Sequence, residues 1–202
     1  MAGTQLLFLD LLATDVEQSE SSDLLSRARA GDQAAFGRIV AEHEDSVMRV
    51  AWRLVRNTED ARDIAQETFL RLHRHVVRLS PDRDPGPWLY RVTDNLALTA
   101  LRSRRRNPEA PLVDDSRDPA LSAGRHEQER RCDAADSRRV IGSLLDQLSE
   151  KERAAIVLRD LEGLDVNAVA QALGCRQGTV RAHLSRGRLK LRKALEAQGG
   201  RP

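Results

Sequence analysis

Apolar residues recur at intervals of three and four positions along most of this 202-residue chain, from residue 22 to 106 and again from residue 137 to 195. Residues at this spacing lie on one face of an α-helix, so each such segment predicts an amphipathic helix. One example follows Thr58, where the spaced residues are Ala61, Ile64, Ala65, Thr68, Phe69 and Leu72. The chain contains no repeat of fixed period, which argues against a solenoid. The sequence therefore predicts an all-α fold.

Turn signals divide the first half of the chain into separate helices. Gly31 followed by Asp32 predicts a helix stop and a new N-cap, and Thr58 in the stretch NTEDA predicts a second N-cap. Three prolines between residues 81 and 87 interrupt the pattern, because proline cannot continue a helix. A further helix is predicted from about Trp88 into the stretch RSRRR.

Residues 107–136 differ from the segments on either side. They hold eight acidic residues, four basic residues, three prolines and few apolar residues. Such a segment buries too little apolar surface to offset its loss of conformational entropy, so it is predicted to be a flexible linker. The expected organisation is two small helical domains on a tether: a disordered leader at 1–22, a first domain at 23–106, the linker at 107–136 and a second domain at 137–196.

The leader contains the apolar run LLFLDLLA, but Asp10 interrupts the run and the first basic residue is Arg27. It is a poor signal peptide and is too short to span a bilayer. A short docking helix is the alternative to a frayed leader. We therefore expect a cytoplasmic protein without membrane insertion, in which Cys132 and Cys175 remain reduced thiols.

The segment 166–195 has the spacing of a helix-turn-helix motif. The apolar face of its first, eight-residue helix is Val166, Val169, Ala170 and Leu173. Gly174 supplies the left-handed stop, and a short turn leads into a second helix. The apolar stripe of that second helix is Val180, Leu184, Leu191 and Leu195. The second domain is therefore predicted to contain a helix-turn-helix.

Positive charge gathers at the ends of both domains. Residues 176–193 carry seven basic residues and no acidic one, although the whole chain has a formal net charge of only +2. Helices with ordinary solvated faces intersperse opposite charges, so this segment predicts binding to DNA phosphates and bases. A second basic cluster, LRSRRR, follows Trp88 and Tyr90 closely, a combination that suits single-stranded nucleic acid. The alternative role for the two aromatics is as core residues.

Signs of catalysis or of a metal site are missing from the sequence. It contains neither a phosphate-binding GxxxxGK[ST] motif nor a nucleophile elbow, and its five histidines are scattered. His126 and Cys132 make only half of a zinc site. We expect no enzyme activity, no metal and no cofactor.

Four stretches in this order resemble one known family. They are GDQAAFGRIVAEH, EDARDIAQETFLRLHRH, WLYRVTDNLAL with LRSRRR, and LSEKERAAIVLRDLEGLDVNAVAQALGCRQGTVRAHLSRGRLKLR. Together they resemble the extracytoplasmic-function group of bacterial sigma factors in the sigma-70 superfamily. Residues 23–106 correspond to region 2 of the family, and residues 137–195 correspond to region 4.

The resemblance implies three sets of contact residues. Those for core RNA polymerase are Asp63, Gln66 and Glu67. Those for the minus-ten promoter element are Trp88, Arg91, Asn95, Arg102, Arg104 and Arg105, together with the loop at 80–87. Those for the minus-thirty-five element are Arg159, Arg181, His183, Ser185, Arg186 and Arg188. The partners implied are core polymerase, promoter DNA and an anti-sigma factor.

The chain departs from the family pattern at Pro85, Thr99 and Arg176, which bear on base preference. Two other classes of function are weighed against a sigma factor. A free-standing helix-turn-helix regulator would bind duplex DNA without polymerase, but this function leaves the helix that contains DIAQE without a role. An enzyme would need a catalytic motif, which the sequence lacks.

Overall fold

The computed structural model describes residues 23–106 and 141–199. These residues form helices joined by turns, and no strand occurs within the two ranges. The named elements are α2 (Gln33–Val55), α3 (Thr58–His75), the 3-10 turn η1 (Val76–Arg78), α4 (Gly86–Arg106), α6 (Glu150–Ile156), the π turn η3 (Val157–Leu161), α7 (Val166–Leu173) and α8 (Gln177–Gly199). Shorter helices span 23–29 and 141–146. The predicted all-α fold is confirmed, whereas the predicted leader (1–22) and linker (107–136) lie outside the described residues.

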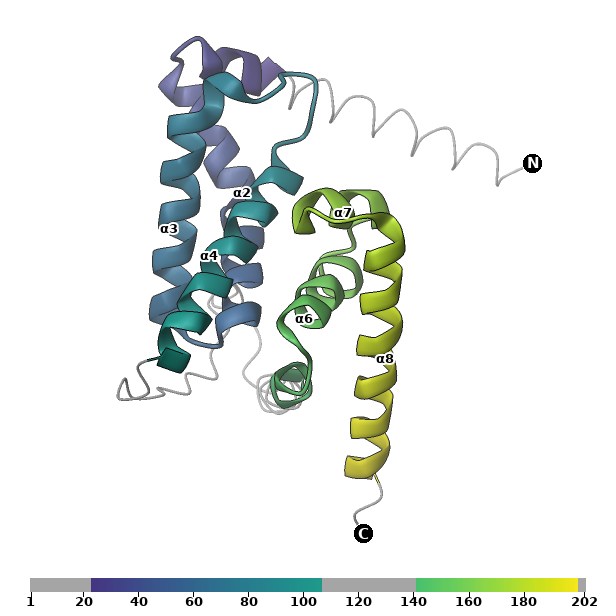
Figure 1. Ribbon diagram of the computed structural model, residues 1–202. Coiled ribbons are helices and arrows are strands. Elements are labelled where there is room, and N and C mark those ends of the chain that lie inside the picture. The colour runs from purple at the N-terminus through teal and green to yellow at the C-terminus, as the bar shows by residue number, and fades with distance from the viewer. Residues whose placement is uncertain (1–22, 107–140, 200–202) are drawn as a thin grey trace, which may run out of the picture.

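The first module consists of α2, α3 and α4, which lie side by side, with the 23–29 helix across one end (Figure 1). The face predicted for α3 is buried at Ala61, Ile64, Ala65, Thr68 and Leu72. Thr68 and Thr93 meet in the interior with hydroxyl oxygens 3.4 Å apart. Each hydroxyl also donates to a main-chain carbonyl in its own helix, so neither buried hydroxyl is left without a partner.

The N-cap predicted for α2 is confirmed, whereas the N-cap of α3 lies one residue before the predicted position. Asp32 caps α2 by accepting hydrogen bonds from the amides of Ala34 and Ala35. At α3 the cap is Asn57, whose side chain accepts from the Asp60 amide, and the predicted cap Thr58 is instead the first helical residue. The prediction of Thr58 as the cap was wrong because both residue types serve as caps, and it is the preceding Asn57 that has extended backbone and accepts the hydrogen bond.

The second module consists of α6, η3, α7 and α8. Ser149 and Glu152 form a capping box at the start of α6, and Asp165 caps α7. Gly174 ends α7 with a φ of 60°, a left-handed conformation that glycine adopts without strain. The helix pair α7 and α8 is the helix-turn-helix that the spacing predicted.

The buried stripe of α8 differs from the predicted one at its end. Val180 and Leu184 are buried, and Leu191 packs at the edge of the core. Leu195 is 51% exposed, and Ala194 is buried in its place. At about 100° per residue, Leu195 lies about 60° around the helix from Val180. The predicted stripe therefore drifts off the buried face in the last turns.

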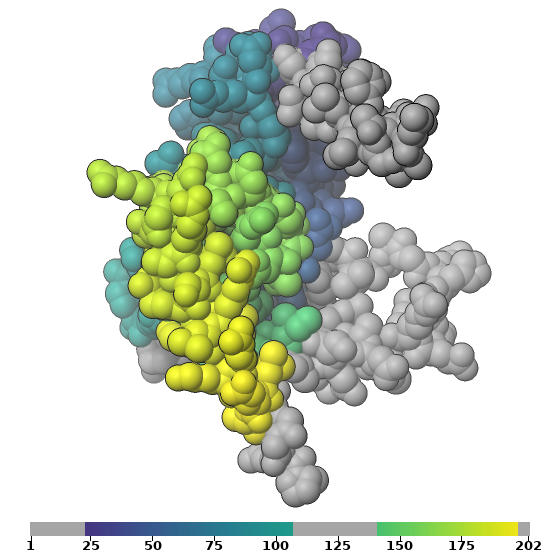
Figure 2. Space-filling model, turned by 90° about the vertical axis from the view of Figure 1, so that its right-hand side faces the viewer, coloured from purple at the N-terminus to yellow at the C-terminus, as the bar shows by residue number. Residues whose placement is uncertain are grey.

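The two modules are packed against each other in this structure. A single apolar cluster joins residues of α2, such as Val50 and Leu54, with residues of the second module, such as Leu148 and Leu158. α4 lies against α7, and α2 contacts η3 (Figure 1). In the space-filling view α8 runs along the outer surface of the second module (Figure 2). The basic helix is therefore at the surface, although the modules share one core.

Candidate nucleic-acid interface

The outer face of α3 carries the three residues proposed to contact polymerase. Because the opposite face of α3 is buried, Asp63 and Gln66 are exposed. Glu67 is half-buried, and its carboxylate accepts a hydrogen bond of 2.8 Å from the Arg71 guanidinium. Leu70, one turn after Glu67, is 44% exposed. Leu70 falls outside the apolar spacing that predicts the buried face of α3. A leucine at such a position is the sequence signal that could have identified an exposed apolar side chain here.

The loop before α4 and the first turns of α4 line a cavity of about 890 Å³. The Asp84 side chain accepts from the Gly86 amide at 2.8 Å and so fixes the start of α4. Trp88 is half-buried, with its ring centroid 6.1 Å from that of His75, while Arg91 is exposed. The other wall of the cavity comes from α7 and the turn before α8, including Gln171, Cys175 and Arg176.

Four of the residues proposed for the minus-ten element share one side of α4. Trp88, Arg91, Asn95 and Arg102 are separated by three, four and seven residues, and this spacing makes a stripe about 20 Å long. Asn95 and Arg102 are exposed.

Arg105 lies one turn after Arg102 and lines the same hollow, whereas Arg104 lies on another side of α4, and both arginines have acidic partners. Arg104 forms an ion pair of 2.7 Å with Asp60 of α3, and Arg105 forms one of 3.1 Å with Glu150 of the second module. A DNA phosphate must replace these partners if either arginine is to bind it.

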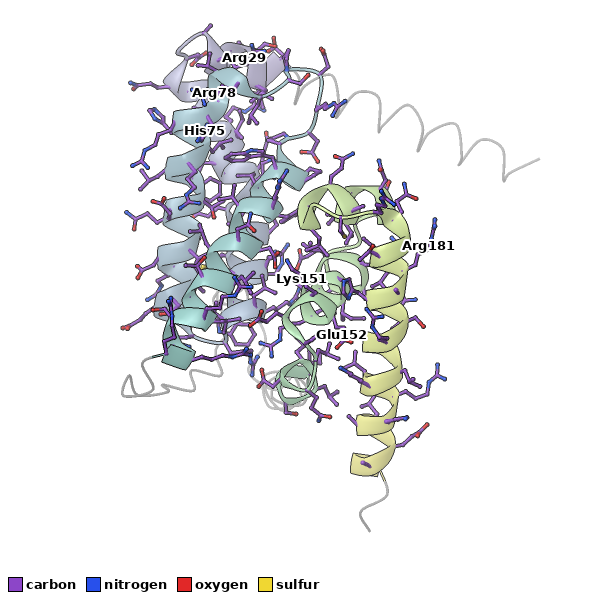
Figure 3. All side chains as sticks on the ribbon, in the orientation of Figure 1. Arg29, His75, Arg78, Lys151, Glu152 and Arg181 are labelled. Carbon is purple, nitrogen blue, oxygen red and sulfur yellow. The ribbon has the colours of Figure 1, made fainter. Side chains whose placement is uncertain are left out.

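The residues proposed for the minus-thirty-five element divide between two sides of α8. Arg159, Arg181, Ser185 and Arg188 line one hollow of about 550 Å³, and Arg192 lies there as well. Arg181 projects away from the helix (Figure 3). His183 and Arg186 lie together on the other side, where the Arg186 guanidinium donates to His183 Nδ1 at 3.1 Å. Burial and the nearby Arg186 both lower the pKa of His183, so its ring is neutral at pH 7.

Acidic residues of neighbouring helices pair with part of the basic surface of α8. Asp160 accepts from Arg188 at 2.6 and 3.0 Å. Glu152 accepts from Lys190 at 2.7 Å and lies 3.6 Å from Arg186. These partners come from η3 and α6, so they are not visible in the local charge pattern of α8. The hydrogen bond from Lys190 is the main reason that the pKa of Glu152 falls to about 2.

Within the described residues, no group of three or more His, Cys, Asp or Glu side chains is placed to bind a metal ion. His126 and Cys132 lie outside those residues. Cys175 is a free thiol, and burial raises its pKa. Among the helices that the structure describes, none combines the length and apolar content needed to span a membrane.

Comparisons with known families match both modules in the predicted order. Residues 39–107 match the family described as Sigma-70 region 2, and residues 138–191 match Sigma-70, region 4. The chain is 38% identical over 173 residues to the ECF RNA polymerase sigma factor SigE of Mycolicibacterium smegmatis, a match that covers 82% of the chain and 64% of that relative's length. It is 30% identical over 186 residues to the RNA polymerase sigma-H factor of Pseudomonas aeruginosa, covering 89% of the chain and 95% of that protein.

Solved structures share the fold. CnrH, in complex with the cytosolic domain of CnrY, is 25% identical, with a TM-score of 0.69 over 88% of this chain and 98% of that one. The sigma factor RpoE from Bartonella quintana, in complex with the anti-sigma factor NepR, is 22% identical, with a TM-score of 0.60 over 80% of this chain and 96% of that one. Two helical modules, a helix-turn-helix and these matches together lead to one assignment. The chain belongs to the sigma-70 family, as an RNA polymerase sigma factor of the extracytoplasmic-function type.

Proposed function

We propose that this protein recruits core RNA polymerase to a restricted set of promoters, with the first module on the minus-ten element and the second on the minus-thirty-five element. The observation that carries the proposal is the joint occurrence of region 2 and region 4 in one chain. A free-standing helix-turn-helix regulator has no use for the first of these regions. The protein acts by binding, without catalysis of its own, in the cytoplasm where polymerase works.

The outer face of α3 is the proposed polymerase contact. Asp63 and Gln66 offer polar groups with free access to a partner, and Leu70 adds apolar area beside them. A polar rim around an apolar side chain is typical of a protein interface. Glu67 belongs to the same surface, where its carboxylate is paired with the Arg71 guanidinium.

The stripe along α4 is the proposed track for the opened minus-ten strand. Trp88 offers a ring on which an unstacked base can lie, and Arg91 and Arg102 offer charges for phosphates. Asn95 lies between them with both a donor and an acceptor for a base edge. Arg104 and Arg105 extend the basic surface once DNA displaces Asp60 and Glu150.

The outer hollow of α8 is the proposed contact for the duplex minus-thirty-five element. Arg181 and Ser185 lie one turn apart on its rim and are suited to base edges, while Arg159 and Arg188 flank them toward the backbone. His183 and Arg186, on the other side of the helix, are assigned to the flank of the groove.

Reconstitution with purified core polymerase tests this function directly. The protein plus core polymerase is expected to start transcription at a few mapped sites that share two upstream elements at fixed spacing. Core polymerase alone is the control. If the protein binds duplex DNA tightly and specifically by itself and forms no complex with core polymerase, the regulator hypothesis replaces this one.

An anti-sigma factor is the proposed regulator. The comparison structure of CnrH was solved with the cytosolic domain of CnrY, and its likeness to this chain covers both modules. Co-purification of the protein from its native cell, followed by identification of any protein present at equal stoichiometry, tests this partner.

A further inference from the structure

The cavity at the start of α4 carries an excess of positive charge. Its volume of about 890 Å³ lies within the range of sites that hold small molecules. The arginines that line it are Arg78, Arg83, Arg91 and Arg176. Among the described residues, none of the four guanidinium groups has a carboxylate within ion-pair distance. The cavity therefore offers four cations to a ligand.

Acidic side chains compensate little of this charge. Asp84 is the one acidic residue among the described residues that line the cavity. Its carboxylate is already engaged, because it accepts from the Gly86 amide at 2.8 Å and lies 3.9 Å from Nε2 of His43. The lining thus has a formal net charge of +3, since four arginines are set against one aspartate. Such a lining favours a ligand with several negative charges over a neutral one.

An aromatic ring lies next to these cations. Trp88 is half-buried, and its ring centroid lies 6.1 Å from that of His75, which supports the ring from one side. Pro85 and Pro87 add apolar surface to the same wall. Arg91 follows Trp88 by three residues, so it lies on the same side of α4. A ring beside cations suits a ligand that joins a planar base to phosphates.

The second module supplies the opposite wall, where α7 lies beside the start of α4 (Figure 1). A Cβ atom on Gly174 would lie 3.8 Å from the Arg91 guanidinium, so the two walls approach closely there. Gln171 is exposed in the cavity, and its side-chain amide can both donate to and accept from the edge of a base. Arg176 precedes α8 at the position where a side-chain oxygen would cap a helix. A guanidinium has no acceptor for that role, and Arg176 instead adds a cation to the cavity.

We propose that this cavity binds a free nucleoside polyphosphate, with the base against Trp88 and the phosphates among the four arginines. The proposed function assigns Trp88 and Arg91 to the opened promoter strand, so a free nucleotide and the strand would compete for this pair of residues. Only that competition rests on the proposed function. Gln171 and Arg176 distinguish the two ligands, because neither belongs to the stripe along α4.

Titration of the full chain with ATP tests the site. Trp88 lies at the cavity, whereas Trp52 is only 4% exposed, so a stacked base should quench the fluorescence of Trp88. Adenosine and inorganic tripolyphosphate are the two partial probes. Each should bind about tenfold more weakly than ATP or worse, because each lacks one of the two recognised groups. Trp88→Leu should abolish the quenching and weaken ATP binding, measured by calorimetry, by about fivefold or more.

Two arginine variants separate the cavity from the general charge of the protein. Arg176→Ala should weaken ATP binding by about tenfold or more, because a charged hydrogen-bond donor is lost. Arg192→Ala removes the same charge from the second module at a residue that lines the other hollow, and it should change ATP binding by less than about twofold. Circular dichroism checks that each variant keeps its helix content. Unsaturable ATP binding, tripolyphosphate that binds as tightly as ATP, or equal effects of the two variants would overturn the proposal.

Competition with a dye-labelled single-stranded DNA separates this site from the proposed function. ATP should displace the strand from the wild-type protein, and Arg176→Ala should weaken ATP binding more than strand binding. If Arg176→Ala weakens both equally, the cavity belongs to the path of the strand and the nucleotide site is wrong. If ATP binds as expected but does not displace the strand, the nucleotide site stands and the strand lies elsewhere. If the protein directs core polymerase to mapped start sites but does not bind ATP, the proposed function stands and the nucleotide site fails.

Discussion

Glu152 illustrates how one side chain can serve both local and long-range structure. It completes the capping box of α6 through the Ser149 amide at 3.0 Å and accepts from Lys190 of α8 at 2.7 Å. The capping box is visible in the sequence as Ser-Glu-Lys-Glu, because its partners are three residues apart. The bond to Lys190 is not, because 38 residues separate the partners and only the packing of α8 on α6 brings them together.

Replacing Glu152 with Gln should lower the free energy of unfolding at pH 7 by about 1–2 kcal/mol, because the charge-assisted bond to Lys190 is lost. The pKa of Glu152 is lowered in the folded protein to about 2, so its contribution is fully present above about pH 4.5 and is lost as the pH falls toward 2. Urea unfolding at several pH values measures the difference between the two proteins. A difference that stays constant from pH 7 to pH 3 would contradict this assignment.

Arg181 is expected to contribute to duplex binding by contact with base edges, and Arg188 is expected to contribute through its charge on the phosphates. Arg181→Ala is expected to weaken specific binding of the holoenzyme to promoter DNA by about tenfold or more.

Asp160→Asn removes the partner of Arg188 and should strengthen duplex binding, with a salt dependence steeper by about one unit. Titrations at several salt concentrations measure both effects. Equal salt slopes for wild type and Asp160→Asn would show that Arg188 does not reach a phosphate.

At the scale of elements, the helices follow from the spacing of apolar residues, while their contacts depend on details that spacing does not contain. α8 crosses α6 at Gly187, where an added Cβ would lie 3.0 Å from Ile156 Cγ1. The glycine thus allows close approach of the two helices. The spacing of apolar residues in α8 does not reveal this close contact, because Gly187 contributes no apolar side chain to the buried face of the helix.

Two glycines of α8 should therefore respond in opposite directions. Gly178→Ala meets no atom within 4 Å and should stabilise the protein by up to about 1 kcal/mol through helix propensity. Gly187→Leu should destabilise it by about 2 kcal/mol or more, because the side chain must displace Ile156 and push α8 from α6. Thermal unfolding of the two variants measures the effects. Equal stability of Gly187→Leu and wild type would rule out a tight crossing.

The two faces of α8 show a second limit of prediction at this scale. The sequence places seven cations on the segment 176–193, and the helical period then assigns Arg181, Ser185 and Arg188 to one side. Which side faces outward depends on where α6 and α7 pack. The resemblance alone grouped His183 and Arg186 with Arg181, and the structure separates them because they lie beside Glu152 of α6.

At the scale of the whole molecule, the division into two modules was predictable from the break in periodicity at 107–136, but their contact was not. The apolar cluster between them is built from residues such as Ala51 and Ala154, which within each module read as ordinary core residues. Polar contacts between the modules also join distant residues: Lys151 and Asp94 are 57 positions apart, and Arg49 and Glu162 are 113 positions apart. Sequence periodicity carries no information about pairs at that distance.

The shared core predicts that the two modules unfold together. Calorimetry of the free protein at neutral pH should give one transition whose calorimetric and van't Hoff enthalpies agree. The Glu162 carboxylate pairs with Arg49 and Arg53 of α2 across this core. Glu162→Arg should separate the transition into two, because a third positive charge there repels the second module from α2. Two transitions in the wild-type protein would show that the modules are independent before any variant is made.

The place of α3 has a consequence for the order of events in transcription. α3 packs on α2 and α4 and lies on the side of the first module away from the second module (Figure 1), and its residues Asp63 and Gln66 are exposed. The second module therefore leaves this face of α3 uncovered. A partner that binds the α3 face can do so while the two modules remain packed together, so that recruitment by this face and separation of the modules can be distinct steps.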